Sequence, residues 1–306
     1  MATFEIEKTN ILKAILPLCI VAHHMSYMPV LLEFRTYGTI INSVFFALSG
    51  YGLSKNYILK GRKYLNSFYQ KRILKIIIPL LVVTLLYIII FENIKDINTI
   101  IIALFSKGAS PLPYSWFVYV LLYLYSSFYF VYKYAPDKFR LLLIFILTFI
   151  FISATYKLGY KKIWFYSVGA FPIGLLYANY EKRIIFELQN RYIYLIVVFF
   201  SIIILRYLIS VHLSFTDLVY FSIFPIVVFV LLSRVNTLKL NYTFITFLSS
   251  ISFELYLSQA MAMNLFRGEY FYVKSDCLYI FLVYVVLLLA AYILHKFCFL
   301  IHKKIS

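Results

Sequence analysis

The sequence predicts an all-α, polytopic membrane protein with about ten transmembrane helices. Of its 306 residues, 63% are hydrophobic and only 13% are charged, whereas an ordinary soluble domain is about 45–50% apolar and about 25% charged. The mean hydropathy of +0.88 supports the same class. Charged clusters divide the chain into apolar stretches of about 17–25 residues, the length of a helix that crosses a hydrocarbon core of about 30 Å.

Ten such stretches follow one another along the chain. A further apolar segment, 97–105, is too short to cross and is expected to be re-entrant or interfacial. No connection is long enough to hold a separate folded domain, so residues 1–306 are expected to form one membrane domain. The expected spans are 11–32, 37–59, 73–91, 112–132, 141–156, 163–180, 192–211, 215–233, 243–266 and 277–301.

Basic residues predict the orientation, because cytoplasmic loops of membrane proteins carry an excess of Lys and Arg. With the N-terminus inside, the 29 Lys and Arg divide into 20 on the cytoplasmic side, 8 on the outer side and Arg206 within a span. Both termini are therefore expected in the cytoplasm. The loop with Lys157, Lys161 and Lys162 falls outside in this arrangement, so the fifth and sixth spans fit it least well.

The same sorting of charges excludes a nucleic-acid partner. A net charge of +17 on a soluble surface would suggest one, but here most of the charge marks one side of a membrane. The three cysteines, Cys19, Cys277 and Cys298, are odd in number and lie in apolar or edge positions. We therefore expect neither a disulfide framework nor a metal site.

Ionisable side chains inside the expected spans are candidate functional residues, because they are costly in lipid. Lys13 and His24 are 11 positions apart, which on an α-helix is about 1100°, or three turns plus about 20°, so they share one face. They are separated by about 16 Å along the helix axis. A cation at the cytoplasmic edge and an imidazole inside the membrane suit a substrate with an anionic head and a distant reactive end, as in acyl-coenzyme A.

Both residues also have plainer interpretations. His23 points about 100° away from His24, so only one of the pair faces the same side as Lys13. A histidine in a span often hydrogen-bonds a neighbouring helix. A lysine near a span end is often an anchor that reaches for the interface.

The chain resembles the acyltransferase-3 family of integral membrane acyltransferases over nearly its whole length. The family opens with a basic residue, ten intervening residues and a histidine, which Lys13 through His24 match with Lys in place of the commoner Arg. Later motifs follow in the family's order. They are Phe45, Phe46, Ser49 and Gly50 (Phe-Phe-x-x-Ser-Gly), a basic stretch leading into proline with Tyr69, Arg72, Lys75 and Pro79, the pair Trp116 and Phe117, and Ser252 through Leu257 (Ser-x-x-x-Tyr-Leu).

Two departures from the family pattern limit what is carried over. Many relatives have a histidine two residues after Tyr-Leu, where this chain has Gln259, so no acid–base role is assigned there. Some relatives carry a fused soluble hydrolase-like domain that completes transfer outside the membrane, and this sequence shows none. Either the membrane part transfers the acyl group directly or a separate protein completes the reaction.

The resemblance implies an O-acyltransferase of the cell membrane. It would move an acyl group, in the simplest case acetyl from cytoplasmic acetyl-CoA, to a hydroxyl of a cell-surface polysaccharide or its lipid-linked precursor. His24 is expected to act as general base or as a transient acyl-histidine, with His23 as the second catalytic candidate. Binding candidates are Lys13, Arg72 and Lys75 for the phosphates of the donor, Ser49 and Gly50 for close approach to it, and Trp116, Tyr119, Glu254 and Arg206 for the acceptor.

Each binding candidate has a structural alternative. Arg72 and Lys75 are three residues apart and on one face, and their only role would be to fix the orientation of the protein in the membrane. The Ser49–Gly50 pair would let helices pack closely. A tryptophan near a span end is often an interfacial anchor, and Arg206 and Glu254 would pair across helices. For the whole chain, the alternatives are a transporter or flippase of lipid-linked sugars, for which neither the repeats nor the paired helix breaks are found, and an acyl carrier that serves a separate extracellular transferase.

Overall fold

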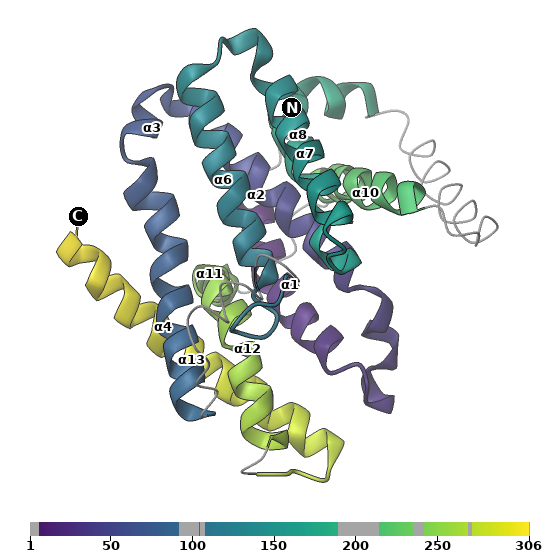
Figure 1. Ribbon diagram of the computed structural model, residues 1–306, viewed down its shortest axis with the longest axis vertical. Helices are drawn as coiled ribbons and strands as arrows, with labels where there is room; N and C mark the ends of the chain where they lie inside the picture. The colour runs from purple at the N-terminus through teal and green to yellow at the C-terminus, as the bar shows by residue number, and fades with distance from the viewer. Residues whose placement is uncertain are drawn as a thin grey trace. The chain divides into compact units, whose positions relative to one another are not determined.

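The computed structural model describes residues 6–91, 104, 108–188, 214–234, 242–268 and 271–305. The described residues fold into helices without a named strand, and the single backbone bridge among them joins Arg267 and Tyr272. The all-α prediction is therefore confirmed. The principal helices (Figure 1) are α1 (Ile6–His24), α2 (Gly38–Lys60), α4 (Leu74–Ile90), α6 (Trp116–Tyr134), α7 (Arg140–Lys157), α8 (Ala170–Leu188), α10 (Ser214–Arg234), α11 (Tyr242–Ser250), α12 (Ser252–Arg267) and α13 (Asp276–Ile305), with short helices η1 (Pro29–Thr36), α3 (Lys63–Asn66), η2 (Tyr69–Ile73), η3 (Asp137–Phe139) and η4 (Lys162–Trp164) between them.

Within the described ranges, four helices are long and apolar enough to cross a membrane. They are Tyr69–Ile90, Asp137–Lys157, Thr216–Ser233 and Asp276–Lys304, and the bent pair Ile6–His24 and Pro29–Thr36 makes a fifth if it counts as one span. The expectation of about ten spans, with both termini in the cytoplasm, stays a prediction. The expected span 192–211, which includes Arg206, and all of the segment 97–105 except Leu104 lie outside the described residues.

The expected span 11–32 is wrong in one respect, because α1 ends at His24. The chain then bends by 116° into η1, whose first residue is Pro29. A residue before proline is restricted to extended conformations, and Met28 adopts one, with φ −86° and ψ 142°. The two histidines therefore lie in the last turn of a helix rather than in its middle.

The expected span 243–266 is also interrupted, and gives α11 and α12 in place of one helix. The break falls at Ile251, which leaves helical geometry with φ −102° and ψ 9°. Just before it, the Ser250 hydroxyl donates to the carbonyl of Phe247 at 2.7 Å. Serine side chains that bond the backbone in this way compete with the regular helix pattern.

The chain divides into two compact units, of which one comprises Met1–Asn10, Thr39–Asn66 and Tyr123–Leu240. In this unit α2 and α8 approach at two glycines. A Cβ atom on Gly50 would lie 2.2 Å from the carbonyl oxygen of Phe171, and one on Gly174 would lie 2.0 Å from that of Ala47. Small residues permit such backbone contact between membrane helices. The contact supports the helix-packing interpretation of Gly50, whereas a contact of Ser49 or Gly50 with a donor stays a prediction.

Gly50→Ala is expected to destabilise the protein, because the new methyl group meets a backbone carbonyl that cannot rotate away. Overpacking of this kind costs about 1–3 kcal/mol. Gly52→Ala is the matched control on the same helix, since nothing lies within 4 Å of its added Cβ. Thermal unfolding of both variants in detergent measures the difference, and equal melting temperatures would contradict the packing argument.

The other unit comprises Ile11–Gly38, Ser67–Leu122 and Asn241–Ser306. Its core joins Ala14 and Val21 of α1 to Leu255 of α12 and to Val283 and Leu287 of α13. On α1 this apolar stripe is turned by about 100° from the face that carries Lys13 and His24, so the polar face borders the core. α12 and α13 lie along one another (Figure 1), and α4 contacts both.

Candidate functional site

The second unit carries all three of the expected donor-binding cations, and they lie at one end of its helices. Lys13 lies near the beginning of the part of α1 in this unit, Arg72 lies in η2 and Lys75 lies in the first turn of α4. The charges of Lys13 and Arg72 are close enough to interact. Lys13 and Lys75 are exposed and Arg72 is half-buried. We call these three residues the cationic group, and a cluster of this kind suits an anion with several charges.

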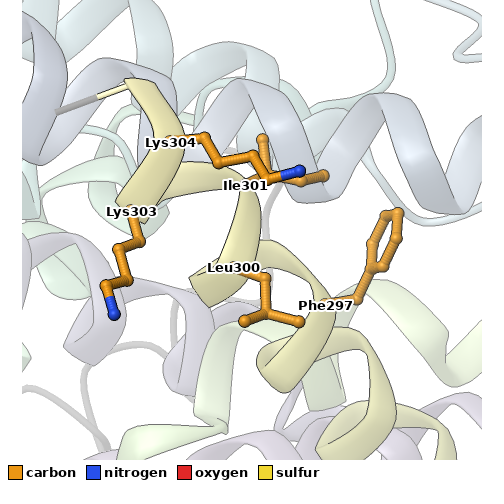
Figure 2. Close-up of a pocket in the computed structure, with 5 residues that line it drawn as sticks. All are labelled: Phe297, Leu300, Ile301, Lys303 and Lys304. Atoms are coloured by element: carbon orange, nitrogen blue, oxygen red, sulfur yellow. The ribbon is translucent and has the colours of Figure 1, made fainter.

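The end of α13 adds further basic residues. His302 lies close enough to Lys75 for an electrostatic interaction. The neighbouring Lys303 and Lys304 line a hollow of about 510 Å³ together with Phe297, Leu300 and Ile301, and Figure 2 shows the two lysine side chains extending in different directions. An apolar surface with lysines at its rim is typical of a span end whose lysines reach the headgroups. We therefore assign this hollow to the lipid interface and not to the reaction.

Glu254 has a partner that the sequence did not indicate. Its Oε1 atom lies 2.9 Å from Nδ1 of His295, which joins α12 to α13, and the Glu254 side chain is buried. The pairing with Arg206 that the sequence suggested lies outside the described residues. Glu254 therefore links two helices within this unit, and its role toward an acceptor stays a prediction.

The two histidines at the end of α1 have different surroundings. Nδ1 of His23 lies 2.9 Å from the carbonyl oxygen of Phe34, and its Nε2 lies close to Gly38, where an added Cβ would be only 2.3 Å away. The His23 ring thus stabilises the turn that follows α1. His24 is half-buried, and its ring stacks on that of Tyr114 with centroids 3.9 Å apart and planes at 26°.

Tyr114 reaches His24 from an unusual backbone conformation. It lies in the turn before α6 and is the one non-glycine residue with positive φ, +65°, in the described part of the chain. Such a conformation is strained for a bulky residue. The hydroxyl of Tyr256, on α12, donates to the Tyr114 carbonyl and also interacts with the backbone of Phe117. Tyr256 therefore holds the turn that places the Tyr114 ring on His24.

Tyr256→Phe tests this positioning role. The variant loses a buried hydrogen bond, which is worth about 0.5–1.5 kcal/mol, and we expect acyl transfer to fall by up to about tenfold in kcat while KM for the acyl donor stays unchanged. The matched control is Tyr123→Phe, which loses a tyrosine-to-carbonyl bond of the same kind, 2.9 Å to Leu147. A kcat for Tyr256→Phe equal to that of the control would show that the turn does not position His24.

Two further expected site residues lie next to this turn. Trp116 is 6% exposed and packs edge-on against Phe117, so it is part of the interior and not an interfacial anchor. Tyr119 is half-buried and its hydroxyl interacts with Ser115, one turn earlier. Both lie in the second unit, as His24 does, and their contact with an acceptor stays a prediction.

A group of tyrosines surrounds the His24 end of the unit, and the sequence did not single it out. Tyr27 interacts with Tyr279 and with Arg267, and Tyr114 lies within electrostatic range of Tyr27 and Tyr87. Each of the four tyrosines comes from a different turn or helix. We define the tyrosine cluster as Tyr27, Tyr87, Tyr114 and Tyr279 together with Asn264 and Arg267.

Gln259 is the other feature that sequence reasoning set aside. Its side chain is 1% exposed, and both amide atoms are buried without a hydrogen-bond partner among the residues described. It lies one turn from Leu255 and one turn from Met263 on α12, and both pack in the same core as Met25, the neighbour of His24. Because an unpaired buried amide is costly, Gln259 is a candidate to bind part of a substrate.

Comparisons with known proteins agree with the resemblance seen in the motifs. The family model of acyltransferase-3, described as an acyltransferase domain, matches residues 6–296. A search of curated proteins and a search of solved structures each returned no significant match.

Proposed function

Because the chain belongs to the acyltransferase-3 family and is a multi-pass membrane acyltransferase, we propose that it transfers an acyl group from acyl-CoA to a glycan hydroxyl. The acyl group is acetyl in the simplest case. The acceptor is a cell-surface polysaccharide or its lipid-linked precursor, and the membrane is the cell membrane. The donor is acetyl-CoA from the cytoplasm, which the predicted cytoplasmic excess of basic residues supports.

One observation carries the proposal: α1 holds a cation and an imidazole on one face, about three turns apart. The helix runs unbroken from Lys13 to His24, so the spacing of about 16 Å expected for an α-helix applies. The donor has the same layout, since its phosphates are separated from the thioester by the extended pantetheine arm. If the phosphates bind at the cationic group and the pantetheine arm extends along α1, the thioester lies near His24.

In the proposed reaction His24 acts as general base. Its imidazole accepts the proton of the acceptor hydroxyl as that oxygen attacks the thioester carbonyl carbon. The C–S bond then breaks, and the coenzyme A thiolate takes the proton from the imidazolium. Gln259, whose amide has no partner among the described residues, is our candidate donor to the oxygen of the tetrahedral intermediate. His23 is the less suitable base, because its Nδ1 is engaged by Phe34.

A direct transfer assay tests the proposal. Purified protein in liposomes is incubated with radiolabelled acetyl-CoA and candidate glycans, and label is measured on glycan, on protein and in the lumen. Label on glycan is the expected result. Label that stays on the protein or only crosses the membrane would show an acyl carrier, and failure to bind coenzyme A would contradict the enzyme and favour a transporter.

A further inference from the structure

We propose that the tyrosine cluster is the acceptor subsite and that it binds a neutral pyranose ring. This inference rests on the proposed function, and it deepens that function by placing the acceptor at a defined group of residues. The acceptor residues expected from the sequence did not include this group. The cluster borders the catalytic candidate directly, because the ring of Tyr114 stacks on His24.

The cluster combines exposed ring surface with buried polar anchors. Tyr27 and Tyr114 are 61% and 36% exposed, whereas Tyr87 and Tyr279 are 5% and 1% exposed. The buried hydroxyls have fixed partners: Asn264 donates its amide to the Tyr87 oxygen at 2.7 Å, and the Tyr279 hydroxyl lies 3.3 Å from the carbonyl of Met263. The cluster thus offers two accessible aromatic rings next to buried polar groups that are held in place by hydrogen bonds. This combination suits a ligand with both apolar faces and hydroxyl groups, as a pyranose has.

An aromatic belt at the membrane surface is the simpler explanation for exposed tyrosines, but it does not account for this group. Belt tyrosines face the headgroups individually, whereas Tyr27 interacts with Tyr279 and with Arg267. The cluster also includes an amide, Asn264, bonded to a tyrosine that is almost fully buried. Tyrosine supplies large rigid contact area together with a hydroxyl, which makes it a common binding residue.

The charge of the cluster favours a neutral sugar. Its one cation among the described residues, Arg267, forms an ion pair with Asp276 and lies 4.3 Å above the ring of Tyr279. Its charge is therefore already balanced. An anionic sugar would have to compete with Asp276 for this guanidinium, whereas a neutral pyranose would leave the pair intact.

The helices also separate this cluster from the cationic group. On α4, Lys75 in the first turn and Tyr87 near the end are 12 residues apart, or about 18 Å. On α13, Tyr279 lies in the first turn and His302 in the last, which is a separation of about 35 Å. The first helix shows the same separation, because Lys13 lies within α1 and Tyr27 lies beyond its C-terminal end. Donor phosphates and acceptor sugar would thus approach His24 from opposite ends of the same helices.

The test measures glycoside binding and acyl transfer on the full-length protein in phosphatidylcholine nanodiscs. Saturation-transfer NMR compares the neutral methyl α-glycosides of glucose, galactose and mannose with methyl α-glucuronide. We expect at least one neutral glycoside to bind more tightly than the glucuronide, and about tenfold weaker binding to the double variant Tyr27→Phe, Tyr87→Phe, which loses two hydroxyl groups but keeps both rings. Tyr292→Phe, half-exposed elsewhere on α13, is the control and should bind as the wild type does.

The outcomes distinguish the subsite from the proposed function. Equal binding by the double variant and the wild type, tighter binding of the glucuronide, or no binding of any neutral glycoside would overturn the subsite. If the wild type transfers label to glycan and the double variant keeps its KM for the acceptor, the enzyme stands and the subsite is wrong. If the glycoside binds as expected but no label is transferred, the subsite stands and the proposed function fails. Melting temperatures of the variants identify any loss through misfolding.

Discussion

His24→Ala is expected to lower acyl transfer by at least a hundredfold without loss of acyl-CoA binding or membrane insertion. A well-placed general base contributes about 10²–10⁴-fold. In the described part of the chain the His24 ring stacks on Tyr114 and lies tilted against His23, but it makes no hydrogen bond that would mark it as a structural link. Transfer of label from acetyl-CoA to glycan gives the rate, and a coenzyme A binding isotherm gives the affinity. A variant that retains more than a tenth of the wild-type rate would reject His24 as the base.

His23→Asn is the matched control for this experiment. Asparagine places an amide nitrogen at the position of Nδ1 of His23, which lies 2.9 Å from the Phe34 carbonyl oxygen, so the turn after α1 should survive. We expect the control to stay within about tenfold of wild type, because even the loss of this hydrogen bond would cost only about 0.5–1.5 kcal/mol. An inactive His23→Asn beside an active His24→Ala would transfer the catalytic role to His23.

The same samples separate the two chemical roles of His24. Without acceptor, a general base leaves the thioester intact, whereas a nucleophilic imidazole carries the acyl group as an acyl-histidine. Denatured wild-type protein labelled in a His24-dependent way would demonstrate the covalent route. Unlabelled protein that still transfers to glycan would demonstrate direct attack by the acceptor.

The helical architecture and the helix positions could largely be predicted, because apolar runs and charged clusters depend on local sequence. The two interruptions could not be placed in advance with the same rules. Pro29 is a visible break signal, but the first expected span was defined by hydropathy alone and therefore extended past Pro29 to residue 32. In the structure α1 ends at His24. The break at Ile251 has no proline and follows Ser250, whose hydroxyl bonds the backbone. Hydropathy is uniform across this position, so it gave no sign of the break.

The site could be predicted where its geometry follows from one helix and not where distant segments meet. Lys13 and His24 share α1, so their spacing was readable from helical periodicity. The Tyr256 hydroxyl bonds a carbonyl 142 positions away, and His295 and Glu254 are 41 positions apart. The family motif identified Tyr256 as a position of interest, but its partner depends on tertiary structure. The proximity of Tyr27 to His24 in sequence was the one available signal for the tyrosine cluster.

The double variant Lys13→Gln, Arg72→Gln is expected to raise KM for acetyl-CoA by about a hundredfold or more. Hydrogen bonds to charged groups are worth about 1.5–3 kcal/mol each, and a factor of ten corresponds to about 1.4 kcal/mol. The two charges lie within electrostatic range of one another, so we expect both to attract the phosphates of one bound donor. Once saturated with donor, the variant should keep most of its kcat, because neither residue is assigned a role in proton transfer.

A donor without the adenosine phosphates shows whether these cations bind substrate or only orient the protein. S-acetyl-pantetheine carries the same thioester on the same arm, so wild type and double variant should use it equally if the cationic group acts on phosphate. Lys60→Gln, which removes an exposed charge at the end of α2, controls for the loss of positive charge and should leave both donors unaffected. A defect of the double variant that persists with S-acetyl-pantetheine would instead mean that the substitutions disturb topology or packing. Because S-acetyl-pantetheine lacks the adenosine as well as the phosphates, the comparison uses the ratio of variant KM to wild-type KM for each donor. Adenosine contacts that are the same in both proteins cancel in this ratio, so a ratio that is high for acetyl-CoA and near one for S-acetyl-pantetheine measures what Lys13 and Arg72 contribute to binding the part of the donor beyond the arm.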